Sequence, residues 1–218
     1  MASRQSIHYS VIVPAYKENG NIRPLVSRIF AALRRIDSPV SAEQTEVIIV
    51  DDNSRDGSVQ TVQQLQQEGY NVRIIVRTTE RGLSSAVVRG FQEAQGDSML
   101  CMDADLQVRK QVTCLAIREL SQANVRLKHP PEYVPTMLAA MSPTHTFVLG
   151  TRYGKGVEMD KDWPVHRRII SAGARLLALP LTTASDPMSG FFGVRKEAVS
   201  TPRYTIRKYS FIYGISSS

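Results

Sequence analysis

Residues 99–107 read Met-Leu-Cys-Met-Asp-Ala-Asp-Leu-Gln, a short apolar run that leads into Asp103, Asp105 and Gln107. The apolar run predicts a buried strand, and three side chains with oxygen atoms follow it at alternate positions. Mg²⁺ and Mn²⁺ prefer oxygen ligands, and Mg²⁺ commonly bridges one or two carboxylates to substrate phosphates. This stretch therefore predicts a hard-cation site at the end of a strand.

Two earlier stretches repeat this arrangement. The apolar residues 47–50 run into Asp51 and Asp52, and the apolar strand predicted at 9–14 leads into the polar segment 15–18. Carboxyl ends of parallel strands meet at one edge of a sheet, and ligands of such sheets bind there. We therefore expect the three strand ends to build one site.

Apolar periodicity divides the rest of the chain into alternating helices and strands. Besides these segments, we expect strands at 72–76, 98–103 and 146–150, and an edge strand at 189–194. Helices are expected at 22–36 with Asn21 as N-cap, between Gly57 and Gly69, and at 84–95, 131–141 and 165–179. Strands separated by helices of this length predict a single α/β domain, with a mainly parallel sheet flanked by helices.

The net charge of +7 does not indicate a nucleic-acid partner, because the excess lies in two stretches. Residues 108–128 carry a net charge of +4 and residues 201–218 carry +3, so the rest of the chain is neutral. A nucleic-acid-binding protein normally gathers its basic residues on one face of the fold.

Other segments exclude further classes. No apolar run reaches the ~18–20 residues that span a bilayer, and the first ten residues lack the apolar core of a signal peptide. The two cysteines provide neither a disulfide framework nor a metal-binding spacing. We therefore expect a chain without a membrane span, in a reducing compartment.

Several families place acids at the edge of a parallel sheet. Response-regulator receivers bind Mg²⁺ with paired aspartates, but they do not require the polar segments 14–18 and 103–107. A dinucleotide-binding fold is disfavoured because no Gly-x-Gly-x-x-Gly follows the first strand, and no P-loop or Gly-x-Ser-x-Gly occurs.

Ordered motifs favour a different family. They are residues 12–18 (IVPAYKE), 50–57 (VDDNSRDG), 81–86 (RGLSSA), 103–107 (DADLQ) and 150–153 (GTRY). Together they resemble the family 2 glycosyltransferases, and within that family the branch of dolichyl-phosphate mannosyltransferases. Residues 167–171 (RRIIS) and 186–192 (DPMSGFF) are similar to the same branch.

The resemblance implies a GT-A-like fold, GDP-mannose as the donor and Mg²⁺ or Mn²⁺ as the cofactor. It assigns the guanosine portion of the donor to Pro14, Tyr16, Glu18, Val50 and Asp52, with Met102 and Ala104 contributing backbone near the nucleotide. It also implies that Asp103, Asp105 and Gln107 ligate the metal on the diphosphate.

For the acceptor, the resemblance implies dolichyl phosphate, held at its phosphate by Arg152, Arg167 and Ser171. A phosphate monoester has a second pKa near ~6, so it is already an anionic nucleophile at neutral pH. No general base is then required, and two arginines can position the oxyanion for inverting attack. The reacting centre would be served by Asp105 and Arg152, with Arg152 also close to the donor.

The resemblance further implies a peripheral enzyme at the cytoplasmic face of the endoplasmic reticulum, with small membrane-anchoring partner subunits. Two alternatives stay open from the residues alone. One is transfer of glucose from UDP-glucose to the same lipid, and the other is an inactive nucleotide-binding or scaffold subunit.

Two segments depart from the family pattern. We expect a glycosyltransferase domain over residues 1–200, interrupted by an atypical insertion at 108–128, and a divergent, poorly ordered tail at 201–218. The insertion adjoins Gln107, so both an active and an impaired site are compatible with the sequence.

Overall fold

A computed structural model describes residues 6–104, 113–114, 130–151 and 190–200. In these segments the predicted strands at the start of the chain form β1 (Tyr9–Ala15), β2 (Thr45–Asp51), β3 (Val72–Val76) and β4 (Ser98–Cys101). Later strands are β5 (Thr113–Cys114), β6 (Phe147–Thr151) and β7 (Phe192–Arg195). The described strands form one sheet in the order β3-β2-β1-β4-β7-β6-β5.

Five of these strands run in one direction. β1 pairs in parallel with β2 and β4, and β2 pairs in parallel with β3. β7 is antiparallel to both β4 and β6, so β6 runs in the same direction as β4. The expectation of a mainly parallel sheet is confirmed for the described residues.

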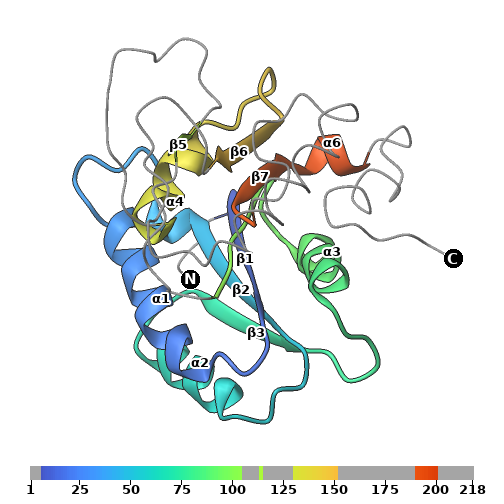
Figure 1. Ribbon diagram of the computed structural model, residues 1–218. Helices are drawn as coiled ribbons and strands as arrows, with labels where there is room; N and C mark the ends of the chain where they lie inside the picture. Colours follow the sequence, from blue (N-terminus) through green and yellow to red (C-terminus); the bar gives the residue numbers. More distant parts are fainter. Residues whose placement is uncertain (1–5, 105–112, 115–129, 152–189, 201–218) are drawn as a thin grey trace, which may run out of the picture.

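Helices cover both faces of the sheet (Figure 1). α1 (Asn19–Leu33), α2 (Ser58–Gln67) and α4 (Pro130–Ala139) lie on one side, where α1 contacts both α2 and α4. α3 (Leu83–Glu93) packs against β1 and β2 on the other side. A short 3-10 helix, η1 (Ala42–Gln44), precedes β2, and α6 (Lys196–Ser200) follows β7.

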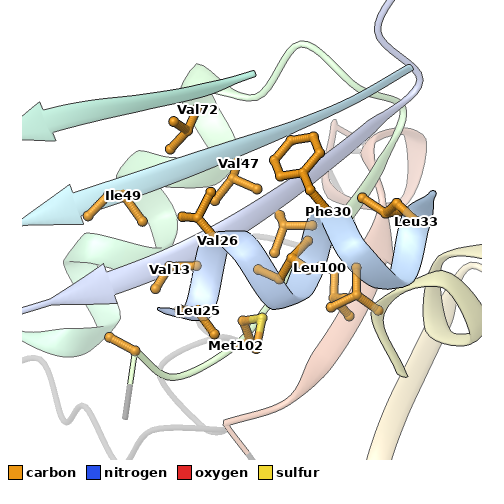
Figure 2. Close-up of a cluster of buried hydrophobic side chains, with 14 of the residues drawn as sticks. Val13, Leu25, Val26, Phe30, Leu33, Val47, Ile49, Val72, Leu100 and Met102 are labelled. Carbon is orange, nitrogen blue, oxygen red and sulfur yellow. The ribbon is translucent and has the colours of Figure 1, made fainter. Parts of the chain in front are cut away.

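Alternate residues of the central strands enter separate cores. Val11, Val13 and Ile49 pack with α1, as Figure 2 shows for the last two, whereas Ile12 and Val50 pack with α3. All five are inaccessible to solvent. A parallel strand buried on both faces reads as a continuous apolar run, which is why these strands were visible in the sequence.

Three sequence expectations are corrected here. Residues 192–195 do not form an edge strand, because β7 pairs with β4 on one side and with β6 on the other. α1 begins at Asn19, and the expected N-cap Asn21 lies inside it. Since α1 ends at Leu33, Ile36 is fully exposed and does not belong to the apolar stripe.

Expectations for three later segments can be compared with the structure only in part. Within the expected insertion at 108–128, Thr113 and Cys114 form β5, which pairs with β6 at the sheet edge. The helix expected at 165–179 and the tail at 201–218 lie outside the described residues. Among the helices that the structure describes, none is long and apolar enough to cross a membrane.

One carboxylate caps both α1 and α2. Neither helix has a side-chain hydrogen bond from its own N-cap residue, Glu18 or Gly57. Instead, Asp56 accepts hydrogen bonds from the backbone N–H of Asn19 (3.1 Å) and of Ser58 (3.1 Å). Burial acts to raise the pKa of Asp56, but the donors of Ser58 and Asn19 outweigh it and hold that pKa below its usual range.

We predict that Asp56→Asn lowers the free energy of unfolding by about 1–2 kcal/mol at pH 7, because two helix N-termini lose a charged cap. An aspartate with a lowered folded-state pKa stabilises the fold above its unfolded value of about 3.9. The difference from wild type should therefore shrink as the pH falls below about 4. Urea titrations at pH 7 and pH 3 measure both values.

The matched control is Asp37→Asn, since Asp37 is exposed and its ion-pair partner among the described residues is the exposed Arg35. It should leave the unfolding midpoint unchanged. A loss for Asp56→Asn that is equally large at pH 7 and pH 3 would contradict the capping role.

Candidate functional site

The carboxyl ends of β1, β2 and β4 lie side by side. Parallel pairing continues past the strand ends, since the N–H of Asp52 donates to the carbonyl of Ala15 (3.1 Å) and that of Met102 to Ile12 (3.0 Å). The chain proceeds from β1 outward to β3 and then returns to β4 on the other side of β1. Such a reversal of strand order is where open α/β sheets bind ligands.

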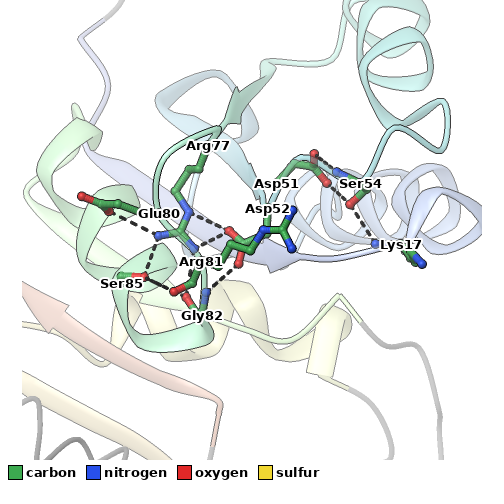
Figure 3. A network of polar contacts seen from close by, with 9 residues as sticks. All are labelled: Lys17, Asp51, Asp52, Ser54, Arg77, Glu80, Arg81, Gly82 and Ser85. Atoms are coloured by element: carbon green, nitrogen blue, oxygen red, sulfur yellow. Dashed lines mark hydrogen bonds and ion pairs between the residues drawn. The ribbon is translucent and has the colours of Figure 1, made fainter.

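Asp52 is held by a buried ion pair with Arg77 (Figure 3). The Nε and Nη2 atoms of Arg77 both donate to Oδ1 of Asp52, the first at 2.7 Å. The other carboxylate oxygen accepts from the backbone N–H of Gly82 (2.8 Å). Asp52 is therefore not a solvated turn residue, and its carboxylate has one orientation.

The same arginine fastens the loop after β3. Its Nη2 donates to the carbonyl of Gly82 (2.9 Å) and its Nη1 donates to Oγ of Ser85 (2.7 Å). Gly82 has a φ of +112°, a conformation that other residues rarely adopt. Arg77 thus ties the start of α3 to the end of β2.

Asp51 performs a different task from its neighbour. Both of its carboxylate oxygens accept hydrogen bonds from Ser54, one from the backbone N–H at 2.9 Å. Oγ of Ser54 in turn accepts from the N–H of Lys17 (2.8 Å), as Figure 3 shows. This chain of contacts clamps the turn after β2 to the loop after β1.

Backbone strain gathers at these loops. Lys17, Asn53 and Arg55 have φ values of +59°, +57° and +54°, and they are the residues other than glycine with positive φ in the described segments. Each such residue costs on the order of 1 kcal/mol, and strained residues cluster at functional sites. The clamp from Asp51 through Ser54 to Lys17 offsets that cost.

The predicted donor residues fall into two groups by exposure. Tyr16 is 51% exposed, Asp103 is exposed and Glu18 is half-buried, so their side chains can meet a ligand. The buried members can contribute mainly backbone groups to a ligand, or determine the shape of the site. These are Pro14, Val50, Met102 and Ala104.

Of the predicted metal ligands, Asp103 is described, and it lies at the end of β4 with the oxygen chemistry that Mg²⁺ and Mn²⁺ prefer. Asp105 and Gln107 lie outside the described residues. Within the described segments, no group of three or more His, Cys, Asp or Glu residues could hold a metal ion. The one described donor fits a hard cation, and the complete ligand set stays a prediction.

The predicted acceptor residues Arg152, Arg167 and Ser171 also lie outside the described residues. The strand before Arg152 is informative, because β6 runs parallel to β4 and ends at Thr151. Its carboxyl end therefore faces the same edge of the sheet, two strand spacings or about 10 Å from the end of β4.

Sequence reasoning missed Arg77. A basic residue directly after the third strand, at the same sheet edge as Asp52, was the available signal. Arg77 belongs to none of the sequence motifs, so its pairing with Asp52 becomes visible only in the folded structure.

Comparison with known proteins identifies the family. The model of glycosyl transferase family 2 matches residues 10–125. The dolichol-phosphate mannosyltransferase of Mycosarcoma maydis is 60% identical over 93% of this chain and 61% of its own length, and that of Saccharomyces cerevisiae is 55% identical over 88% and 62%. The protein of that name from Pyrococcus furiosus is 40% identical over 87% and 47%. The chain thus spans about three fifths of the length of the two fungal relatives.

Solved structures agree on the fold. A mannosyltransferase of Pyrobaculum calidifontis, in complex with GDP-Man and Mn²⁺, has a TM-score of 0.50 at 17% identity, over 88% of this chain and 45% of that one. Glucosyl-3-phosphoglycerate synthase of Mycobacterium tuberculosis, in complex with Mn²⁺ and UDP-glucose, has a TM-score of 0.51 at 18% identity, over 91% and 60%. At these identities the likeness concerns the fold alone.

We predict that Arg77→Met lowers the free energy of unfolding by about 3–5 kcal/mol, because it leaves the carboxylate of Asp52 buried without its partner. Combining it with Asp52→Asn should restore part of this loss. The control is Arg23→Met, which breaks the exposed pair with Glu68 and should cost below about 1 kcal/mol. Urea denaturation that finds equal losses for Arg77→Met and Arg23→Met would contradict the structural role of the buried pair.

Proposed function

Since this chain belongs to glycosyl transferase family 2, we propose that it is a dolichyl-phosphate mannosyltransferase, which transfers mannose from GDP-mannose to dolichyl phosphate with inversion. The observation that carries the proposal is the high identity, over most of this chain, to fungal proteins named dolichol-phosphate mannosyltransferase. Its lipid product would serve protein glycosylation and GPI-anchor precursors.

The donor site would use the described strand ends. The exposed ring of Tyr16 is available to stack on the guanine base, with Glu18 beside it and with Pro14 and Val50 forming the floor. Asp52 would line the same site, with its buried carboxylate held in a single orientation by Arg77 and Gly82.

The diphosphate would lie at the end of β4. Asp103, Asp105 and Gln107 would hold Mg²⁺ or Mn²⁺, with backbone of Met102 and Ala104 nearby. When bound, the cation supplies charge neutralisation for the departing diphosphate. Asp103 contributes an exposed carboxylate just beyond β4, whose residues are all buried.

The acceptor phosphate needs positioning rather than deprotonation, because its second pKa is near ~6. We assign this task to Arg152, Arg167 and Ser171, with Arg152 and Asp105 closest to the reacting atoms. The direction of β6 supports the assignment of Arg152, because that strand ends at Thr151 on the same sheet edge.

A polyprenyl acceptor lies in a membrane, so the reaction would take place at a membrane surface. We assign the chain to the cytoplasmic face of the endoplasmic reticulum as a peripheral protein, with small membrane-anchoring partner subunits. The proposal also includes the division of the chain. It consists of a glycosyltransferase domain at 1–200, an atypical insertion within it at 108–128, and a divergent tail at 201–218.

The deciding experiment is a donor screen with a polyprenyl phosphate acceptor, with and without Mn²⁺. We expect Mn²⁺-dependent release of GDP and a mannosylated lipid from GDP-mannose, but no product from UDP-glucose. Product from UDP-glucose alone would favour the glucosyl alternative, and nucleotide binding without turnover would favour an inactive subunit. A variant lacking residues 108–128 tests whether this segment impairs the site.

We predict that Asp103→Asn lowers mannosyl transfer about 100-fold, a change equivalent to about 2.7 kcal/mol of transition-state stabilisation. The matched control is Asp97→Asn, an exposed aspartate that precedes the opposite end of β4. Radiolabelled mannose in the lipid phase measures both variants. Equal activity of the two variants would remove Asp103 from the site.

A further inference from the structure

Gly190 lies directly across from Asp103. β4 and β7 are antiparallel, with Ser98 opposite Arg195 and Cys101 opposite Phe192. The same register, continued by two residues, sets Gly190 opposite Asp103. Side chains of directly opposed residues project from the same face of a sheet, with Cβ atoms about 4.5–5.5 Å apart.

A side chain at position 190 would meet the carboxylate of Asp103. A Cβ atom built on Gly190 would lie 2.7 Å from Oδ1 and 2.7 Å from Oδ2, and 3.0 Å from Cγ. These separations are well below carbon–oxygen van der Waals contact. The absence of a Cβ at Gly190 therefore leaves the space that the Asp103 carboxylate occupies.

The backbone that follows Gly190 is firmly anchored. Phe191 is buried in the core beside α1, and its carbonyl accepts a hydrogen bond from the N–H of Gly150 (2.8 Å). Phe192 is fully buried in the core beside α3, where its ring centroid lies 6.0 Å from that of Phe91. With one ring in each core, Phe191 and Phe192 hold the backbone beside Gly190 in place.

We propose that Gly190 is a positioning residue for Asp103: it keeps the carboxylate at the open edge of the sheet, in the place where it can ligate a divalent cation. This inference rests on the proposed function for the identity of the ligand. The steric argument rests on the short separations between a Cβ at position 190 and the Asp103 carboxylate, on the pairing of β4 with β7 and on the burial of Phe191 and Phe192.

The first test measures Mn²⁺ binding to the full chain in the presence of GDP. The electron paramagnetic resonance signal of free Mn²⁺ reports how much of the ion remains unbound. We expect Gly190→Ala to weaken Mn²⁺ binding at least about tenfold, because the alanine methyl displaces the carboxylate. The control is Gly193→Ala in β7, whose Cβ would lie 2.8 Å from Val148 Cγ2 and 2.9 Å from Met141 Sδ, away from Asp103. It should change Mn²⁺ affinity less than twofold.

The second test uses stability and needs no metal. Gly190 has no positive φ, so an alanine there suits the backbone and its cost comes from the clash. Gly190→Ala should lower the thermal unfolding midpoint in the wild-type chain but not in an Asp103→Ala background. If Gly190→Ala alone does not fold, recovery of folding in the double variant is the expected result.

Three outcomes would overturn the inference. They are equal Mn²⁺ affinity in Gly190→Ala and wild type, an equal loss in Gly193→Ala, and additive stability losses in the double variant. A wild-type chain that binds GDP but no Mn²⁺ would instead contradict the metal in the proposed function, and with it the ligand role of Asp103. The stability cycle separates the two failures, because it reads the contact between Gly190 and Asp103 directly.

Discussion

β1 hydrogen-bonds in parallel to β2 on one side and to β4 on the other, and the candidate site depends on this pairing. It brings Tyr16, Asp52 and Asp103 to one edge from parts of the chain that are tens of residues apart. The apolar side chains of β1 alternate between two cores, so a slip of one residue would exchange the cores. The register, and with it the relative height of the polar strand ends, is therefore strongly specified.

Polar contacts hold the loops that follow the strands. Asp51 and Asp52 are neighbours with different partners. Asp51 accepts hydrogen bonds from Ser54 in the turn after β2, and Asp52 pairs with Arg77 directly after β3. Each carboxylate satisfies donors that the close approach of strand ends would otherwise leave unpaired. The loops can then hold strained conformations at Lys17 and Asn53, which a solvated turn would relax.

Much of this architecture could be predicted from sequence because its signals are local. Continuous apolar runs such as 47–50 gave the buried strands, and ordered motifs gave the family. The insertion of β7 between β4 and β6 could not be predicted, since the partners Cys101 and Phe192 are far apart in the chain. The shared cap at Asp56 was hidden for the same reason, because its partner Asn19 lies 37 residues away.

The place of β7 also has a consequence for biosynthesis. During synthesis β4 emerges early, but its free edge must wait for Phe192, roughly 90 residues later, which takes on the order of 5–20 s at ribosomal rates. Until then the nascent chain presents an unpaired strand edge, a template for intermolecular pairing. β1, β2 and β4 can pair first, and β7 is the last of the described strands to emerge. This topology is therefore exposed to aggregation during translation.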